Sequence, residues 1–320
     1  MKENTKQQLQ ASFKSQDTEE WLDIYFTRPI GLWWANFFNR FDCHPNVITI
    51  FSIFLGIGAG VMFYFTDFIS NLIGVLLLMW ANFYDSADGQ LARMTGKKTH
   101  WGRILDGFAG DLWFYTIYIS LCLRLMPQVI PFTHMEWSFW IFIVAVLSGL
   151  VCHTKQCQLA DYYRNIHLFF LKGEKESELD TSAQQRTLRN NTPKKGNFWW
   201  RAFLYGYTNY TRAQEKMTPQ FQLLIQYIKN VRKGKIPDAF RSDFRTKSLP
   251  LIKFTNILTF NCRAIVLYIG CLLNIPWIYF ITELTFFTFL AIYMHYKHEK
   301  LCSEMQRRLE TDFYNKEKEQ

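Results

Sequence analysis

The chain has 320 residues, an apolar fraction of 49%, an aromatic fraction of 18% and a formal net charge of +9. Its first residues lack the basic, apolar and small-residue pattern of a cleaved signal peptide, so we expect none. Its seven cysteines are scattered, odd in number and without a CxxC pair. This spacing argues against a disulfide framework and against a cysteine-ligated zinc site.

A polar and aromatic segment, residues 1–45, opens the chain. Within it, residues 21–40 are expected to form an amphipathic helix that either lies in the membrane interface or caps a helical bundle. Apolar runs follow at residues 47–65, 69–84, 112–123, 139–151, 264–279 and 281–293. A bilayer-spanning helix needs roughly 20 residues, and several runs approach that length. We therefore expect an all-α integral membrane bundle of six transmembrane helices.

Helices one to four of this bundle fall in residues 46–171 and helices five and six in residues 251–297. The expected outer loops, residues 66–71, 126–134 and 274–277, contain no Lys or Arg. By the positive-inside rule, both ends, the tail 298–320 and the stretch 84–111 face the cytoplasm. The sequence thus predicts a multi-pass protein of the cell's inner (cytoplasmic) membrane.

A basic cytoplasmic insertion is expected at residues 172–250, after a fourth helix that continues beyond the lipid. It has sixteen Lys and Arg residues against seven acidic ones, and an aromatic cluster between residues 198 and 210. Such a composition suits anionic lipid headgroups and also nucleic acid. Because the insertion is tethered beside a membrane, we favour lipid contact and expect no nucleic acid; packing against the cytoplasmic face is the alternative.

Carboxylates gather where the second apolar run ends and the third begins. An α-helix turns about 100° per residue, so Asp85, Asp88, Gly89 and Ala92 share one helix face, and Gly102 and Asp106 share a face of the next helix. Converging carboxylates at a membrane boundary are costly unless they are paired or bind metal. Hard divalent cations such as Mg²⁺ or Mn²⁺ resolve that repulsion, and two such ions can hold a diphosphate.

The structural alternative for these acids is helix capping or ion pairing with nearby basic residues. Four Asp residues, counting Asp111, flank one short loop with Gly and Ala between them. That arrangement favours metal binding over capping.

The pattern D-x2-D-G-x2-A-R-x8-G-x3-D resembles the signature of the CDP-alcohol phosphotransferase (phosphatidyltransferase) family. Its positions are Asp85, Asp88, Gly89, Ala92, Arg93, Gly102 and Asp106. The stretch HPNVIT at residues 44–49 also looks like a motif of this family. The resemblance implies that Asp85, Asp88 and Asp106 bind two Mg²⁺ or Mn²⁺ ions, and that Gly89, Ala92, Arg93 and Gly102 line the cytidine and phosphate site.

The family's fourth Asp, a metal ligand and the favoured general base, follows Asp106 by four residues. Here Gly110 occupies that position and the acid is Asp111, about 100° further round an ideal helix. We expect the helix to widen locally by one residue, as π-turns at functional sites do, so that Asp111 serves as metal ligand and catalytic base. Another base, such as His153, and a loss of activity are the alternatives.

An acceptor pocket is expected among Arg263, Asn256 and His153. Arg263 lies in an apolar run and is expected to point into the bundle, with Asn256 seven residues earlier on the same face. Each of these side chains is equally compatible with a hydrogen bond inside the bundle.

The resemblance implies an enzyme that transfers a phospho-alcohol from a CDP-alcohol to an acceptor hydroxyl and releases CMP, in phospholipid or phosphosphingolipid headgroup synthesis. Its partners would be a CDP-linked lipid or headgroup, an acceptor alcohol, membrane lipids and a second copy in a homodimer. The first rival is a membrane scaffold that has lost the base. The second, a divalent-cation transporter, fits less well because the acids cluster at one end of the helices instead of at mid-membrane.

Overall fold

The computed structural model describes residue 15 and residues 17–97, 99–173, 177 and 179–311. Part of the predicted N-terminal segment (1–14 and 16) and of the predicted tail (312–320) lies outside the described residues. The described chain is helical, apart from an isolated antiparallel bridge between Val129 and Glu136. The all-α prediction is confirmed. The chain divides into two compact units, which are described separately.

The first unit comprises Met1–His153 and Phe260–Thr285. Its α-helices are α2 (Arg28–Arg40), α3 (Pro45–Met62), α4 (Phe68–Thr95), α5 (His100–Leu125), α6 (Trp140–Val146), α12 (Phe260–Leu272) and α13 (Trp277–Thr282). Three π-helical segments adjoin them: η1 (Asp23–Thr27), η2 (Leu147–His153) and η3 (Glu283–Phe287), which runs into the second unit.

Five helical stretches among the described residues are long and apolar enough to cross a membrane: Pro45–Met62, Phe68–Thr95, Trp140–Lys172, Asp238–Leu272 and Trp277–Glu310. These spans make the chain a multi-pass membrane protein. The helix α5, which the six-helix prediction counts as a span, is not among the five. Side chains such as Phe54 of α3, 68% exposed, point away from the bundle, as lipid-facing residues do.

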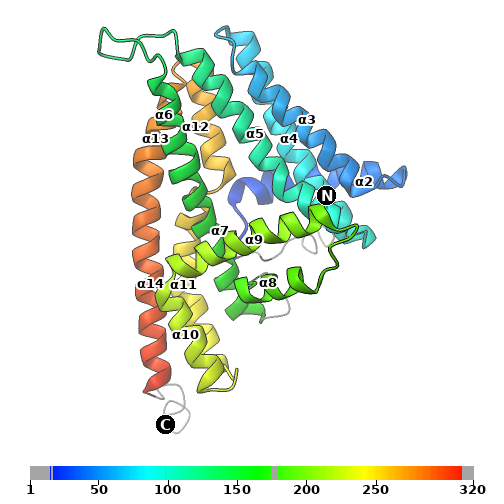
Figure 1. Cartoon of the computed structure of the whole chain (residues 1–320), viewed down its shortest axis with the longest axis vertical. Coiled ribbons are helices and arrows are strands. Elements are labelled where there is room, and N and C mark those ends of the chain that lie inside the picture. Colours follow the sequence, from blue (N-terminus) through cyan, green and yellow to red (C-terminus); the bar gives the residue numbers. More distant parts are fainter. Residues whose placement is uncertain (1–14, 16, 98, 174–176, 178, 312–320) are drawn as a thin grey trace. The chain divides into compact units, whose positions relative to one another are not determined.

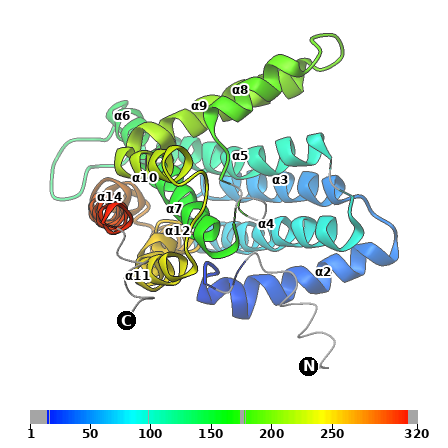
Figure 2. The same ribbon diagram turned by 90° about the horizontal axis from the view of Figure 1, so that it is seen from below.

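Helix α3 packs along both α4 and α5, and α2 packs against α4 (Figures 1 and 2). Glycines on α3 allow the close approach to α5. A Cβ atom on Gly56 would overlap the indole of Trp113, and one on Gly60 would lie 2.7 Å from Cγ2 of Thr116. Small residues commonly bring membrane helices together in this way, because lipid gives little hydrophobic drive for their association.

Arg124, in the last turn of α5, ties three segments together at the end of this unit opposite the carboxylates. Its Nη1 donates to the Phe63 carbonyl at 2.9 Å and to Asn71 Oδ1 at 2.8 Å, and its Nη2 donates to Asn274 Oδ1 at 2.7 Å. Only 3% of Arg124 is exposed. These bonds satisfy a charge that would otherwise be costly so close to hydrocarbon.

The second unit comprises Thr154–Thr259 and Phe286–Gln320. Its helices are α7 (Thr154–Lys172), α8 (Ser182–Asn191), α9 (Phe198–Met217), α10 (Pro219–Asn230), α11 (Asp238–Ile257) and α14 (Thr288–Glu310). A core of buried side chains from α7, α10, α11 and α14 holds it together, including Phe170, Phe221, Phe244 and Met305. The helix Trp140–Lys172 has 33 residues, more than the roughly 20 that cross a bilayer. Its continuation past the lipid stays a prediction.

We predict that Gly56→Ala destabilises the protein and that Gly58→Ala, on the same helix, does not. Alanine favours a helix over glycine by about 1 kcal/mol at either position. At Gly58 a Cβ meets only Leu77 Cδ1, at an ordinary 3.6 Å, whereas at Gly56 it overlaps Trp113. Overpacking costs about 1–3 kcal/mol. Thermal melting in detergent should show a lower Tm for Gly56→Ala alone; equal melting of the two variants would contradict the packing of α3 on α5.

Candidate metal-binding active site

Helix α4 carries the first two carboxylates because it continues past the apolar run and ends only at Thr95. Gly96 follows it in the left-handed conformation, at φ 70°, which glycine adopts without strain and which commonly ends a helix. Asp85 and Asp88 therefore stand about one turn apart on one face of a regular helix, as predicted. Asp88 is 4% exposed.

The start of α3 positions both neighbouring helices. His44 caps α3, its Nδ1 accepting from the Asn46 backbone N–H at 3.2 Å. The Asn46 amide donates to Thr99 Oγ1 at 3.3 Å, and Thr99 in turn caps α5 by accepting from Gly102 N–H at 2.9 Å. One turn further along α3, Thr49 Oγ1 donates to Asp88 Oδ2 at 2.5 Å and fixes that carboxylate.

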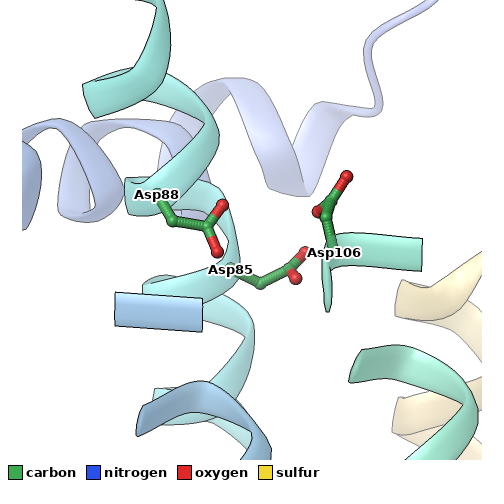
Figure 3. A group of neighbouring side chains, drawn as sticks. All are labelled: Asp85, Asp88 and Asp106. Atoms are coloured by element: carbon green, nitrogen blue, oxygen red, sulfur yellow. The ribbon is translucent and has the colours of Figure 1, made fainter. Parts of the chain in front are cut away.

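Asp106 of α5 completes a three-carboxylate cluster with Asp85 and Asp88. One carboxylate oxygen from each lies within 4.8 Å of the other two, and Figure 3 shows the groups approaching one another from α4 and α5. Asp88 is buried, Asp85 is half-buried and Asp106 is exposed, so the cluster opens to the surface on the Asp106 side.

The positive charges of two arginines act on the cluster. Arg93 interacts with Asp88 and Asp106, and Arg28 interacts with Asp85 and with Arg93. Arg28 comes from the start of α2, and its guanidinium binds Glu19 through Nη2 at 2.9 Å and Nε at 3.3 Å. Sequence analysis selected Arg93 but missed Arg28, which belongs to no motif.

The position of Arg28 follows from how α2 crosses α4. Gln90 Nε2 of α4 donates to the Arg28 carbonyl at 3.1 Å. A Cβ atom on Gly31 would lie 2.7 Å from Ser86 Oγ, so only glycine lets the two helices come this close. The preceding segment is held by Asn261 of α12, whose Nδ2 donates to Glu20 at 2.7 Å and to Asp23 at 3.0 Å.

The small residues of the signature have different surroundings. A Cβ atom on Gly89 would lie 3.4 Å from Arg93 Nη1, so Gly89 leaves space beside that guanidinium. A Cβ atom on Gly102 would lie 2.7 Å from Asn46 Oδ1. Gly102 therefore serves the contact between α3 and α5, in addition to any contact with a ligand.

The predicted widening of α5 is wrong. The helix is a regular α-helix from His100 to Leu125, and Asp111 is not in the three-carboxylate cluster. Five residues along a regular helix amount to about 140° of rotation, which turns Asp111 to another side of α5 from Asp106. The segment keeps its α-helical hydrogen bonds. A Cβ atom on Gly110 would meet nothing within 4 Å, so no neighbouring side chain pushes the backbone into a bulge there.

The predicted acceptor residues have partners of their own. Arg263 is fully buried, as expected, and its Nη1 pairs with Glu283, which is also fully buried. His153 Nδ1 lies 3.4 Å from the Tyr118 hydroxyl and 3.8 Å from Glu283 Oε1. Sequence analysis missed Glu283, although a single acid in an apolar run was the available signal.

The prediction that Asn256 and Arg263 share a helix face assumed an unbroken helix between them, and the helix is broken there. The helix α11 ends at Ile257 and α12 begins at Phe260. The buried Oδ1 of Asn256 has no hydrogen-bond partner in the described chain. Its role in binding an acceptor stays a prediction.

The donor set of the cluster fits a hard divalent cation. Among the described side chains it consists of carboxylate oxygens alone, on two helices, as Mg²⁺ and Mn²⁺ prefer. The exposed Asp106 leaves an open side on which phosphate oxygens can complete a coordination shell. Three carboxylates, two flanking arginines and an open side together suit a bound diphosphate.

Comparison with known proteins agrees with this chemistry. Residues 43–168, from the start of α3 to most of α7, match the family described as CDP-alcohol phosphatidyltransferase. An uncharacterized protein of Aquifex aeolicus (strain VF5) is 39% identical over 72 residues, which are 22% of this chain and 35% of that protein. The match thus spans about a third of that relative's length. No solved structure matches the chain.

The matched segment contains all seven signature residues and the three clustered carboxylates. Over residues 43–168, the chain is similar to the CDP-alcohol phosphatidyltransferase family.

Proposed function

We propose that this protein transfers a phospho-alcohol group from a CDP-alcohol to an acceptor hydroxyl and releases CMP. The observation that carries the proposal is the cluster of Asp85, Asp88 and Asp106, which occupies the signature positions inside the matched segment. The product would be a phosphodiester lipid. Either CDP-diacylglycerol and a small polar alcohol, or a CDP-headgroup and a lipid alcohol, satisfies this chemistry.

In this proposal the carboxylate cluster holds two Mg²⁺ or Mn²⁺ ions, which when bound supply charge neutralisation at the diphosphate. Thr49 keeps Asp88 in one orientation through its hydrogen bond. Arg93 and Arg28 add positive charge beside the cluster, where the negative charge of the diphosphate would lie. Gly89 and Ala92 leave space for the nucleotide next to Arg93.

The reaction forms one bond and breaks one. The acceptor oxygen bonds to the phosphorus on the alcohol side, the bond from that phosphorus to the CMP oxygen breaks, and the acceptor proton passes to a base. Asp111 is our candidate for that base, since it adjoins the position where the signature has its fourth carboxylate. Because α5 is regular, the acceptor would have to approach Asp111 from a different side of the helix than the cluster.

The membrane arrangement is part of the same proposal. We assign α5 as a sixth span and place the cluster at the cytoplasmic face of the cell's inner membrane, because the expected outer loops, residues 66–71, 126–134 and 274–277, contain no Lys or Arg. Arg263, His153 and Asn256 remain candidates for contact with the acceptor.

A membrane scaffold that no longer catalyses transfer is the second candidate function. The observation that favours it is the regular α5, which leaves Gly110 where the signature has its fourth Asp. The two functions differ in a single assay, CMP release by the purified protein with Mn²⁺ and a panel of CDP-alcohols and acceptors. CMP release with at least one donor and acceptor pair supports the enzyme. The absence of CMP release with every pair supports the scaffold.

We predict that Asp85→Asn, Asp88→Asn and Asp106→Asn each reduce CMP release to below about a tenth of wild type at saturating metal, because each removes an anionic metal ligand. The matched control is Asp67→Asn at the other end of α4. There Asp67 Oδ1 accepts from Ser70 N–H at 2.8 Å, and asparagine caps a helix equally well. Activity above a tenth in a folded cluster variant would contradict the proposal.

We predict that Arg28→Gln raises KM for the CDP-alcohol by about 10-fold or more, because a hydrogen bond to a charged group contributes about 1.5–3 kcal/mol. Arg40→Gln, an exposed arginine at the end of the same helix, is the control and should leave KM unchanged. The double variant Glu19→Gln/Arg28→Gln separates phosphate binding from loss of the Glu19 pair. If it recovers the wild-type KM, Arg28 acts only by neutralising Glu19.

We predict that Asp111→Asn lowers kcat by about 100-fold, the usual contribution of general base catalysis. Adding Gly110→Asp to that variant should restore activity, because this position has room for a side chain and lies four residues after Asp106. Full activity of Asp111→Asn would exclude Asp111 as the base and direct the search to His153.

A further inference from the structure

The hairpin of α8 and α9 has an apolar surface that its own fold leaves uncovered. The two helices pack against each other (Figure 1). On the first half of α9, Phe198 is 70% exposed, Trp199 65% and Tyr205 59%. Leu188 of α8 is 46% exposed. Three aromatic rings exposed within eight residues of one helix are a large apolar surface for a segment that is otherwise polar.

The other face of α9 is occupied within the second unit. Trp200, Phe203, Tyr207 and Tyr210 stack in succession along it, with centroid distances of 5.3, 5.8 and 6.2 Å. Near its C-terminal end, Gln214 Nε2 donates to the Gln158 carbonyl of α7 at 3.0 Å. This face therefore anchors α9 within the second unit. The exposed residues Phe198, Trp199 and Tyr205 are not part of that anchoring contact.

The hairpin is also strongly basic. Residues 182–217 contain seven Lys and Arg residues and one acidic residue, Glu215. That carboxylate is used internally, since it accepts from Ser182 N–H at 2.8 Å and from Ser182 Oγ at 2.5 Å. Lys194 and Lys195 are exposed in the turn directly before Phe198, and the Arg189 guanidinium lies 5.4 Å from the centre of the Tyr205 ring.

We propose that this surface, formed by Leu188, Lys194, Lys195, Phe198, Trp199 and Tyr205, docks the α8–α9 hairpin into the headgroup region of an anionic bilayer. Exposed tryptophan and tyrosine beside lysine are the side chains that favour the membrane interface. The positive charge of this surface attracts anionic lipid and repels a second copy of the same surface. Only residues 173–181 separate the hairpin from α7, which continues from a candidate membrane span, so a bilayer is within reach.

Within the insertion, residues 172–250, the predicted lipid contact thus falls on the α8–α9 hairpin. The later helices α10 and α11 direct most of their aromatic side chains, such as Phe221 and Phe240, into the core of the second unit, although Leu223 and Phe254 are exposed. The turn between α10 and α11 is basic, with exposed Lys233 and Lys235, but has only Val231 as a large exposed apolar side chain. It thus offers a control that matches the charge without the aromatic residues.

Hydrogen exchange of the full-length protein in nanodiscs tests this docking. The backbone N–H groups of Phe198 and Trp199 open α9 and have no acceptor within the helix, so they exchange fast unless something covers them. We expect them to exchange at least 10-fold more slowly in discs of phosphatidylcholine with anionic phosphatidylglycerol than in phosphatidylcholine alone. The difference should shrink as salt increases, because salt screens the attraction. The α10–α11 turn should show a smaller difference.

Two variants and a charge-matched control complete the test. Phe198→Ser/Trp199→Ser and Lys194→Gln/Lys195→Gln should each abolish the protection, whereas Lys233→Gln/Lys235→Gln should retain it. Three results would overturn the proposal: equal exchange in both lipid compositions, equal loss of protection in the control variant, and protection that depends on added RNA or on the number of copies per disc.

Discussion

Three carboxylates whose oxygens lie within 4.8 Å repel one another, and the first unit is organised around keeping them together. One of them, Asp88, is 4% exposed, so water cannot relieve its charge. The chain supplies a hydroxyl from Thr49 and two arginines at the edge, and three anionic groups still face a shared space. Divalent cations are the natural counter-charge for such a group, and a diphosphate is the natural ligand for the cations.

The close packing of α3, α4 and α5 keeps the three carboxylates together. Asp106 meets Asp85 and Asp88 only if α4 and α5 are held at a fixed separation, and α3 contacts both. Gly56 and Gly60 allow α3 to approach α5, while Asn46, Thr49 and Thr99 connect α3 to the two helices beside the cluster. At the other end, Arg124 of α5 binds Phe63 after α3, Asn71 of α4 and Asn274 between α12 and α13. The site is thus positioned by contacts between rigid helices, which suits chemistry that depends on distances between charges.

Much of the cluster could be predicted from the sequence, because helix periodicity and a seven-residue signature are local features. Asp85, Asp88 and Asp106 come together as that pattern implies. Arg28 belongs to no motif and could not be found in this way. Thr49 lies in the HPNVIT stretch and Glu283 is a single acid in an apolar run, but their contacts with Asp88 and Arg263 arise from packing between segments apart in the chain. The expected π-turn in α5 failed because glycine permits a bulge without requiring one. Two of the three described π-helices, η2 and η3, instead contain His153 and Glu283, and π-helical turns often mark function.

The most direct test of the central claim is a Mn²⁺ titration of the purified protein by electron paramagnetic resonance, with and without CDP, for the wild type and Asp88→Asn. The signal of free Mn²⁺ reports binding without any need for turnover. A site built from these carboxylates predicts saturable Mn²⁺ binding that CDP tightens in the wild type, and weak binding indifferent to CDP in Asp88→Asn. Equal Mn²⁺ binding by the two proteins, or no saturable binding by the wild type, would contradict the account.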